Sequence, residues 1–238
     1  MRLKANLHFH CADDPEDVIS YALHEGIDYA AECGFSVLAS TCHNKVVWSV
    51  RDARYAADKN ILLLPGIELG LRENAAAGKH VVILNCGNDA EGIRTFEDLA
   101  SYRRTHPDIF VIAPHPYFYG NFSLKGLLDR HIELFDGIEH SWFYSRRFNR
   151  NVRAIQKAKE VGLPLIATSD THYLRHFNDD YAIIHAAQKT TKAVIEALRR
   201  GAVENVTIPK SAIRDMLVRR GAFTIKGIIQ RIVRLPNR

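Results

Sequence analysis

Short apolar runs that alternate with helical stretches are the feature that most constrains how this chain can fold. Seven runs have the length and composition of buried strands, and most intervals between them have helical spacing. This alternation is typical of a parallel sheet with helical crossovers, and seven such units in one domain favour a closed barrel over an open sheet. The predicted fold class is therefore an α/β barrel, with strands expected at residues 3–9, 35–39, 61–68, 80–84, 109–113, 135–140 and 163–168.

Most of these runs end in histidine or glutamate or are followed within four residues by histidine or aspartate. His8 and His10 close the first run, and residues two apart in an extended strand point to the same side, so both imidazoles should face one place. Leu7 and Phe9 should then both face the other way, into packing. In α/β barrels the chemistry lies at the carboxyl ends of the strands, where residues distant in sequence meet. The fourth run differs, because it begins with His80.

The residues at these ends are numerous enough for more than one metal ion. A single tetrahedral zinc takes three or four ligands, so this number fits two or three divalent ions with a carboxylate such as Glu68 bridging. Imidazole and carboxylate ligands together suit Zn²⁺, Mn²⁺ or Fe²⁺. Such a cluster activates water and neutralises phosphate charge, so hydrolysis of a phosphate ester is expected. The candidate ligands are His8, His10, Asp13 or Asp14, His43, Glu68, His80, His115, Asp170 and His172.

Five short motifs, in order, resemble those of the PHP (polymerase and histidinol phosphatase) superfamily. The resemblance spans about residues 3–201, and it implies a distorted seven-stranded (β/α)7 TIM-like barrel. It further implies a stand-alone metal-dependent phosphoesterase with a trinuclear site. The motifs are His8-x-His10, Thr41-Cys42-His43-Asn44, Pro65-Gly66-Ile67-Glu68, Ala113-Pro114-His115-Pro116 and Ser169-Asp170-Thr171-His172.

The resemblance also implies which residues hold each ion. One ion would be bound by His8, His10, Glu68 and Asp170; Glu68 would bridge to a second ion bound by His80 and His115; a third would be bound by Asp14, His43 and His172. Glu68, Asp170 and His172 are the predicted catalytic residues.

This sequence departs from the family pattern at two places. The loop after His10 is shorter than usual, so Asp13 is an alternative to Asp14 as the acidic ligand. Relatives commonly have Asp before the histidine of the second motif, whereas this chain has Cys42. The acceptor that should orient His43 is therefore not identified, although histidine ligands usually need one.

Other residues near the predicted site have weaker claims. His140 lies at the end of the sixth strand. It could line the pocket, or it could instead support the residues that do, and the sequence favours neither role. Arg146, Arg147 and Lys45 could contact a phosphate, although ordinary surface roles explain them at least as well. Tyr117, Phe118, Tyr119 and Phe122 could stack on a base or sugar, or simply pack. The remaining histidines, His24, His106, His131, His176 and His185, are assigned to ordinary capped or solvent-facing positions.

Composition favours a cytoplasmic globular protein. Hydrophobic residues make up 47% of the chain and charged residues 25%, and no apolar run approaches the roughly 20 residues that span a bilayer. The first residues lack the apolar segment of a signal peptide. The four cysteines are scattered, so neither a disulfide framework nor a zinc knuckle is indicated.

The C-terminal segment differs from the rest in charge. Residues 210–238 have a net charge of +7, whereas the whole chain has a net charge of +5. Residues 1–209 therefore have a net charge of −2. We expect a barrel domain over 1–209 and a basic, partly amphipathic extension over 210–238. A basic amphipathic helix can lie on an anionic membrane surface, and it can also pack on the barrel or on another subunit, which is favoured here. Nucleic acid is a further partner for its basic face, without support from interleaved aromatic residues.

The predicted function is hydrolysis of a phosphate ester by metal-activated hydroxide. The substrate classes that fit are a nucleotide, a sugar phosphate or a compound resembling histidinol phosphate, and a small phosphorylated molecule is favoured. Two alternatives remain: C–N bond hydrolysis of the amidohydrolase type, and a non-catalytic barrel recruited to a membrane or complex by its basic tail. The sequence does not distinguish monoesterase from exonuclease action.

Overall fold

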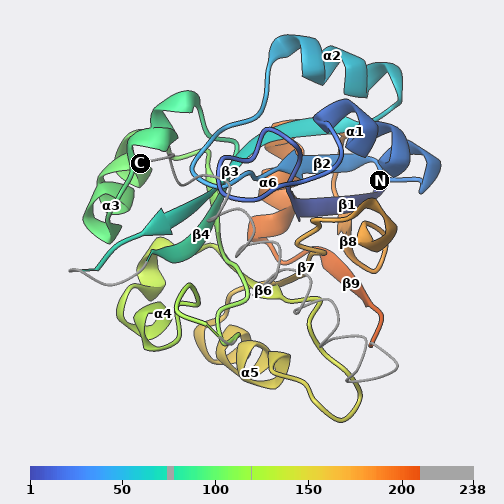
Figure 1. The fold of residues 1–238 in the computed structure, drawn as a ribbon. Coiled ribbons are helices and arrows are strands. Elements are labelled where there is room, and N and C mark those ends of the chain that lie inside the picture. Colours follow the sequence, from blue (N-terminus) through green and yellow to red (C-terminus); the bar gives the residue numbers. More distant parts are fainter. Residues whose placement is uncertain (74–77, 119, 210–238) are drawn as a thin grey trace, which may run out of the picture.

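Helices surround one curved sheet of nine strands in a computed structural model, which describes residues 1–73, 78–118 and 120–209 (Figure 1). The strands are β1 (Arg2–Phe9), β2 (Val37–Ser40), β3 (Leu62–Leu71), β4 (Lys79–Leu84), β5 (Phe110–Ala113), β6 (Gly137–His140), β7 (Leu165–Ala167), β8 (Asp180–His185) and β9 (Val203–Thr207). The α-helices are α1 (Leu23–Glu32), α2 (Val50–Asp58), α3 (Phe96–Thr105), α4 (Gly126–Arg130), α5 (Asn151–Val161) and α6 (Thr191–Arg199). Three short 3₁₀ helices cover Asn88–Gly92, Ile132–Leu134 and Leu174–His176.

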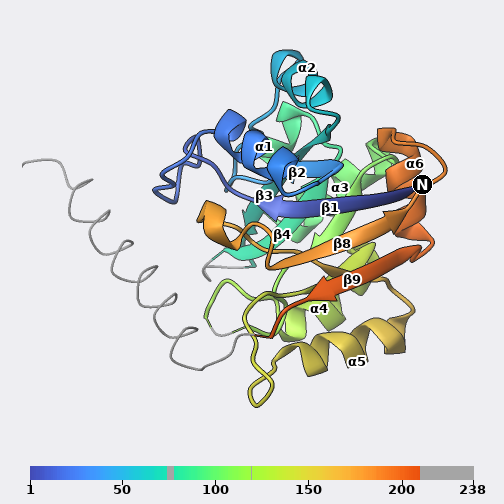
Figure 2. The same ribbon diagram turned by 90° about the vertical axis from the view of Figure 1, so that its right-hand side faces the viewer.

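The α/β barrel class is confirmed, but the predicted number of seven strands is wrong. All seven expected strands form, and β8 and β9 are added between β1 and β7, in the order β7-β6-β5-β4-β3-β2-β1-β8-β9. Figure 2 shows β8 lying between β1 and β9. Neither added strand is a continuous apolar run, because side chains of β8 alternate between buried and half-buried and those of β9 are half-buried or exposed.

Two strands run against the others, and one of them explains the position of His80. β4 is antiparallel to both β3 and β5, and β8 is antiparallel to β1 and β9. Because β4 is reversed, its first residues lie at the same end of the barrel as the last residues of its neighbours. The pairing of His80 with Gly70 places that histidine beside the end of β3.

A side chain joins the two edges of the sheet. Asn205 of β9 accepts a hydrogen bond from the Ala167 backbone N–H (2.7 Å) and donates one to the Leu165 carbonyl (2.8 Å) on β7. The amide thus makes the pair of bonds that a neighbouring strand would make. The sheet is nearly closed by this contact.

The interior of the barrel is apolar, and α6 packs into it. Leu7, Leu64 and Phe110 from different strands share one buried cluster with Val194 and Leu198 of α6. The sequence offers Thr190 or Thr191 as the cap of this helix, and in the structure it is the Thr190 side chain that accepts a hydrogen bond from the Ala193 N–H. Two further clusters lie between the sheet and the outer helices.

A bulge at the end of β1 corrects the expectation that Leu7 and Phe9 face the same way. The pairing of β1 with β2 shifts register between Asn6 and Phe9. Leu7 consequently packs inside the barrel, whereas Phe9 packs outside it with Ile27 of α1. Bulges re-aim side chains in this way and are common beside active sites.

Several helices are shorter than their sequence patterns predict. Helical spacing in the sequence predicts a helix from Val18 to Cys33 and another from about Arg146 to Val161, but α1 begins at Leu23 and α5 at Asn151. α5 ends as predicted at Gly162, which adopts the left-handed φ of 70°. The predicted extension over 210–238 lies outside the described residues. Within the described ranges, no helix is both long and apolar enough to cross a bilayer.

The bridging amide of Asn205 should contribute measurably to stability. Asn205→Ala removes both hydrogen bonds to β7, and we expect the free energy of unfolding to fall by about 1–2 kcal/mol. Urea unfolding followed by circular dichroism measures this. The exposed Gln188→Ala is the control, and an unchanged midpoint for Asn205→Ala would contradict the role given to this side chain.

Candidate metal centre

The carboxylate of Glu68, on β3, lies at the centre of the site. Its side chain is 1% exposed, and histidines from four other strands or strand ends surround its two oxygens. The nitrogens near Oε2 belong to His8 (Nε2, 3.2 Å), His10 (Nε2, 3.3 Å) and His43 (Nε2, 3.2 Å). Those near Oε1 belong to His80 (Nδ1, 2.8 Å) and His115 (Nε2, 3.1 Å).

Backbone contacts fix the end of β3 that carries Glu68. The Glu68 N–H donates to the Cys42 carbonyl, and the Asn44 N–H donates to the Glu68 carbonyl, so His43 and Glu68 form a parallel bridge. Gly66 allows this approach, because a Cβ there would lie 2.9 Å from the Ser40 carbonyl oxygen. A larger residue at position 66 would push β3 away from β2.

Asp170 adds a second carboxylate on the β7 side. Its Oδ1 lies 3.5 Å from His8 Nε2 and 3.3 Å from His10 Nε2. Asp170 has a φ of 44° and His115 a φ of 31°. Non-glycine residues rarely adopt these values, and such strain is concentrated at functional sites.

Carboxylates behind the rings hold three of the histidines in place. His8 Nδ1 lies 3.1 Å from Glu139 Oε2, and His10 Nδ1 lies 2.8 Å from Asp14 Oδ2. His43 Nδ1 lies 3.0 Å from the same Asp14 oxygen. In each ring Nδ1 therefore donates outward and Nε2 is directed at Glu68, which is the arrangement typical of metal-binding histidines.

Asp14 thus supplies the acceptor for His43 that the sequence left unidentified. Its Oδ2 also accepts from the His43 backbone N–H, and its Oδ1 accepts from the N–H groups of Glu16 and Asp17. The alternative Asp13 has an exposed side chain, 3.9 Å from Lys45 Nζ. Of the two aspartates, Asp14 is the one that reaches the cluster.

His172 contacts an aspartate that the sequence analysis did not single out. His172 Nδ1 donates to the Asp170 carbonyl (3.0 Å), and its Nε2 lies 2.9 Å from Asp17 Oδ2. The same Asp17 oxygen is 3.9 Å from His43 Nδ1. The His172 ring also stacks on that of His10, with centroids 4.3 Å apart.

The geometry fits divalent cations. Among the described residues, three groups have potential ligand atoms within 4.8 Å of one another: His8, His10, Glu68 and Asp170; His10, Asp14 and His43; and His43, Glu68 and His80. His80 Nδ1 is buried 2.8 Å from Glu68 Oε1, yet it is not aligned for a hydrogen bond with any partner. A nitrogen and an oxygen in this relation can share a cation.

Without a metal the cluster is a set of buried ion pairs. Burial alone would lower the pKa of His8, but the carboxylates of Glu68, Asp170 and Glu139 raise it to about 10. Burial would also lower the pKa of His10, but the nearby carboxylates raise it well above its usual range. Burial would raise the pKa of Glu68, but the surrounding histidines hold it well below that of an ordinary carboxyl. Burial keeps the pKa of His80 below its usual value.

Sequence reasoning missed Glu139, Asp17 and Trp142. Glu139 is fully buried at the end of β6, and the pattern of acidic residues at strand ends could have found it. Trp142 Nε1–H donates to Asp170 Oδ2 (3.4 Å), a contact with no sequence signal. His140, left open above, belongs to none of the three groups, and burial lowers its pKa to about 4.

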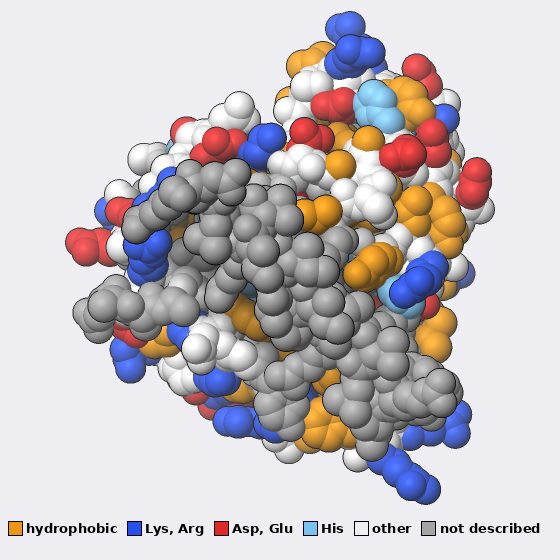
Figure 3. Space-filling view, viewed as in Figure 1, with side chains coloured by type: hydrophobic (Ala, Val, Ile, Leu, Met, Phe, Trp, Pro, Cys, Tyr) orange, Lys and Arg blue, Asp and Glu red, His pale blue; other side chains and the backbone are white. Residues whose placement is uncertain are grey.

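The other predicted contacts have ordinary surroundings. Arg146 and Arg147 are exposed. Many other Lys and Arg side chains lie on the surface seen in Figure 3, several of them along its lower edge. The Tyr117 ring packs under Arg153, and Phe122 stacks on His80 with centroids 5.1 Å apart. The five histidines assigned to ordinary roles contact residues outside the cluster: His24 with Asp52, His106 with Asp89, His131 with Phe96, His176 with Asp179 and His185 with Glu204.

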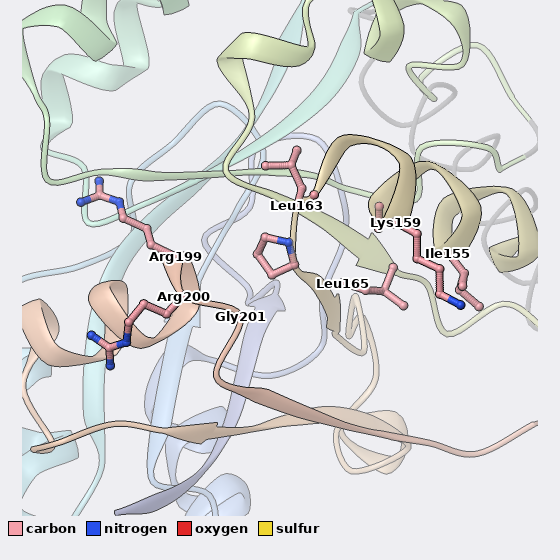
Figure 4. Close-up of a pocket in the computed structure, with 10 residues that line it drawn as sticks. Ile155, Lys159, Leu163, Leu165, Arg199, Arg200 and Gly201 are labelled. Atoms are coloured by element: carbon pink, nitrogen blue, oxygen red, sulfur yellow. The ribbon is translucent and has the colours of Figure 1, made fainter.

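A separate pocket of about 420 Å³ lies elsewhere on the barrel. It is at the amino-terminal end of β7, between the ends of α5 and α6, where Lys159, Arg199 and Arg200 surround Leu163 and Leu165 (Figure 4). Asp170 follows the opposite end of the same strand. The pocket is therefore not part of the metal centre.

Comparison with solved structures gives matches over most of the chain. A two-domain protein from Bacteroides vulgatus that contains a predicted PHP-like metal-dependent phosphoesterase is 19% identical, with a TM-score of 0.67 over 87% of this chain. This chain spans 65% of that protein. No family model matches the sequence, and comparison with curated proteins gives no match.

The chain shares its fold with a PHP-like phosphoesterase domain. A lesion-specific endonuclease from Pyrococcus furiosus is 11% identical, with a TM-score of 0.63 over 87% of this chain and 59% of the other. An amidohydrolase from Chromobacterium violaceum is 16% identical, with a TM-score of 0.58 over 84% of this chain and 97% of the other. The PHP resemblance predicted from the five motifs is thus confirmed at the level of the fold.

The raised pKa of His8 gives the metal-free protein a defined pH dependence. A group whose pKa is about 10 when folded and about 6.5 when unfolded stabilises the fold fully below pH 6.5, and this stabilisation is lost as the pH rises to 10. In excess chelator, the urea midpoint should therefore fall between pH 7 and pH 10. His8→Gln should show a shallower fall, and a midpoint that rises over this range would contradict the assigned ion pairs.

Proposed function

We propose that the protein is a metal-dependent hydrolase of phosphate esters. The observation that carries the proposal is the buried Glu68 carboxylate, whose two oxygens each face two or three histidine nitrogens. A carboxylate so placed can bridge two cations, and a two-metal site suits the in-line displacement at phosphorus. The PHP fold, shared with PHP-like phosphoesterases, supports the same reaction class.

Two cations would share Glu68. The first would be held by Glu68 Oε2 with His8, His10 and Asp170, and the second by Glu68 Oε1 with His80 and His115. Zn²⁺, Mn²⁺ and Fe²⁺ are the ions that this mixture of imidazole and carboxylate ligands suits. When bound, they would activate water near neutral pH and neutralise charge on the phosphate.

For a third cation we assign Asp17, in place of Asp14, together with His43 and His172. The support is the 2.9 Å contact between Asp17 and His172 and the five hydrogen bonds that already occupy Asp14. Asp14 then orients His10 and His43, and Glu139 orients His8. Trp142 holds Asp170 through its indole N–H.

A small phosphorylated molecule is the substrate we favour, with nucleic acid as the second class. The nucleic-acid class is supported by the endonuclease fold relatives, one of which was solved with duplex DNA bearing an abasic lesion. The amidohydrolase among the fold relatives keeps C–N hydrolysis as a rival. The number of acidic and imidazole side chains favours phosphate, because cleavage of a phosphate ester needs the most charge neutralisation.

Glu68→Gln should remove the two cations that share Glu68 and severely reduce turnover. The amide keeps the size of the side chain but loses the charge that bridges two cations, so we expect a fall of about 10³-fold in the rate of phosphate ester hydrolysis. The assay uses Mn²⁺ and Zn²⁺ with phosphate monoesters, a DNA oligonucleotide, an amide and a lactone.

Circular dichroism confirms that the variant folds, and metal content is measured by mass spectrometry. Full turnover by a folded, metal-replete Glu68→Gln protein would overturn the proposal. If the wild-type protein hydrolyses only the amide or lactone, the proposed phosphate ester hydrolysis is wrong and the amidohydrolase-type reaction is correct.

Asp17→Asn and Asp14→Asn should differ in metal stoichiometry. Removal of a ligand should lower the bound metal by one equivalent in Asp17→Asn. Loss of an orienting group should keep the stoichiometry in Asp14→Asn but weaken affinity about 10- to 100-fold. Isothermal titration measures both, with the exposed Asp13→Asn as control. The opposite pattern would restore Asp14 as the ligand.

A further inference from the structure

Two cysteine thiols lie in contact directly behind the metal centre. The sulfur atoms of Cys11 and Cys42 are 3.5 Å apart, and both residues are fully buried. Cys11 follows His10 in the chain, and Cys42 precedes His43. Each thiol is thus one peptide bond from a residue of the cluster.

The two thiols are set apart from the rest of the site by their packing. Both belong to the buried apolar cluster between the sheet and α1 and α2, which also contains Phe9, Ile27 and Leu38. The other two cysteines lie elsewhere, Cys33 at the end of α1 and Cys86 after β4. Of the four cysteines, all within the described residues, Cys11 and Cys42 are the pair whose sulfur atoms are in contact.

The pairing of β1 with β2 places Cys11 and Cys42 at corresponding positions on neighbouring segments. β1 and β2 are parallel and pair Phe9 with Ser40, and the Thr41 N–H donates to the Phe9 carbonyl. Cys11 and Cys42 each come two residues after that pair. A disulfide bond is about 2.05 Å long, so the sulfurs need to approach by roughly 1.5 Å to bond.

We propose that Cys11 and Cys42 form a reversible disulfide, and that the disulfide weakens metal binding at His10 and His43. The second part rests on the proposed metal centre, whereas the first does not. Drawing the sulfurs together would displace the segments that follow β1 and β2, which carry these histidines. The residues of a binding site must be held within about 0.5 Å of their productive positions. About a third of the 1.5 Å approach of the sulfurs, passed on to the histidines, is therefore enough to disturb metal binding.

The oxidant in this proposal is a peroxide. One thiol loses its proton and attacks a peroxide oxygen; the O–O bond breaks, a sulfenic acid forms, and hydroxide leaves as water with that proton. The second sulfur attacks the sulfenic sulfur; the S–S bond forms, the S–O bond breaks, and a second water leaves with the second thiol proton. Two thiols and one hydrogen peroxide thus give one disulfide and two waters.

The first test needs no metal. The full chain, reduced and freed of metal with a chelator, is treated with hydrogen peroxide, and its peptides are mapped by mass spectrometry without reduction. We expect a cross-linked peptide pair that contains Cys11 and Cys42 and has lost two hydrogen atoms. Cys33, which is half-buried, controls for non-specific oxidation. Oxidation of Cys11 or Cys42 only to isolated sulfinic acids would overturn the proposal.

The second test measures the link to the metal centre. Titration with Zn²⁺ should show at least one equivalent bound about tenfold more weakly after oxidation, and dithiothreitol should restore the affinity. Cys42→Ala should bind Zn²⁺ equally with and without peroxide. Unchanged affinity in the disulfide form overturns the link. Absence of Zn²⁺ binding by the reduced protein overturns the proposed function instead, and the peptide map still decides the disulfide.

Discussion

The close contacts between one carboxylate and five imidazoles are the interaction on which the rest of the structure depends. Glu68 lies 1% exposed inside the barrel, and a buried charge of this kind is costly unless it is paired on every side. The histidines around it lie on β1 and β4 and in the segments that follow β1, β2 and β5, and Asp14 and Glu139 contact three of them on the far side of the ring. Acidic side chains therefore lie on both sides of these histidines, with Glu68 on one side and Asp14 and Glu139 on the other.

The fold departs from a regular parallel barrel where the cluster requires it. Reversal of β4 brings His80 to Glu68, and the bulge in β1 separates the directions of Leu7 and Phe9. His115 and Asp170 adopt backbone conformations that are rare outside glycine. These local costs occur beside the cluster, as expected where function and packing compete.

Much of this arrangement could be predicted from the sequence. The seven apolar runs gave seven strands in place, and their polar ends gave the residues that converge. β8 and β9 could not be predicted, because half-exposed strands have no continuous apolar run. The contacts of Asp14 with His10 and His43, and of Asp17 with His172, depend on the path of a loop that no periodicity describes. Glu139 follows the strand-end pattern and was open to prediction, whereas Trp142 was not.

The central claim is that Glu68 bridges cations, and anomalous diffraction from crystals grown with Mn²⁺ tests it most directly. We expect an anomalous peak beside each of the two Glu68 oxygens, the two peaks separated by about 3.5–4 Å. His8 and His10 should coordinate one of them, and His80 and His115 the other. Crystals in which Glu68 remains paired directly with its histidines, and in which no anomalous peak lies within the cluster, would contradict the account.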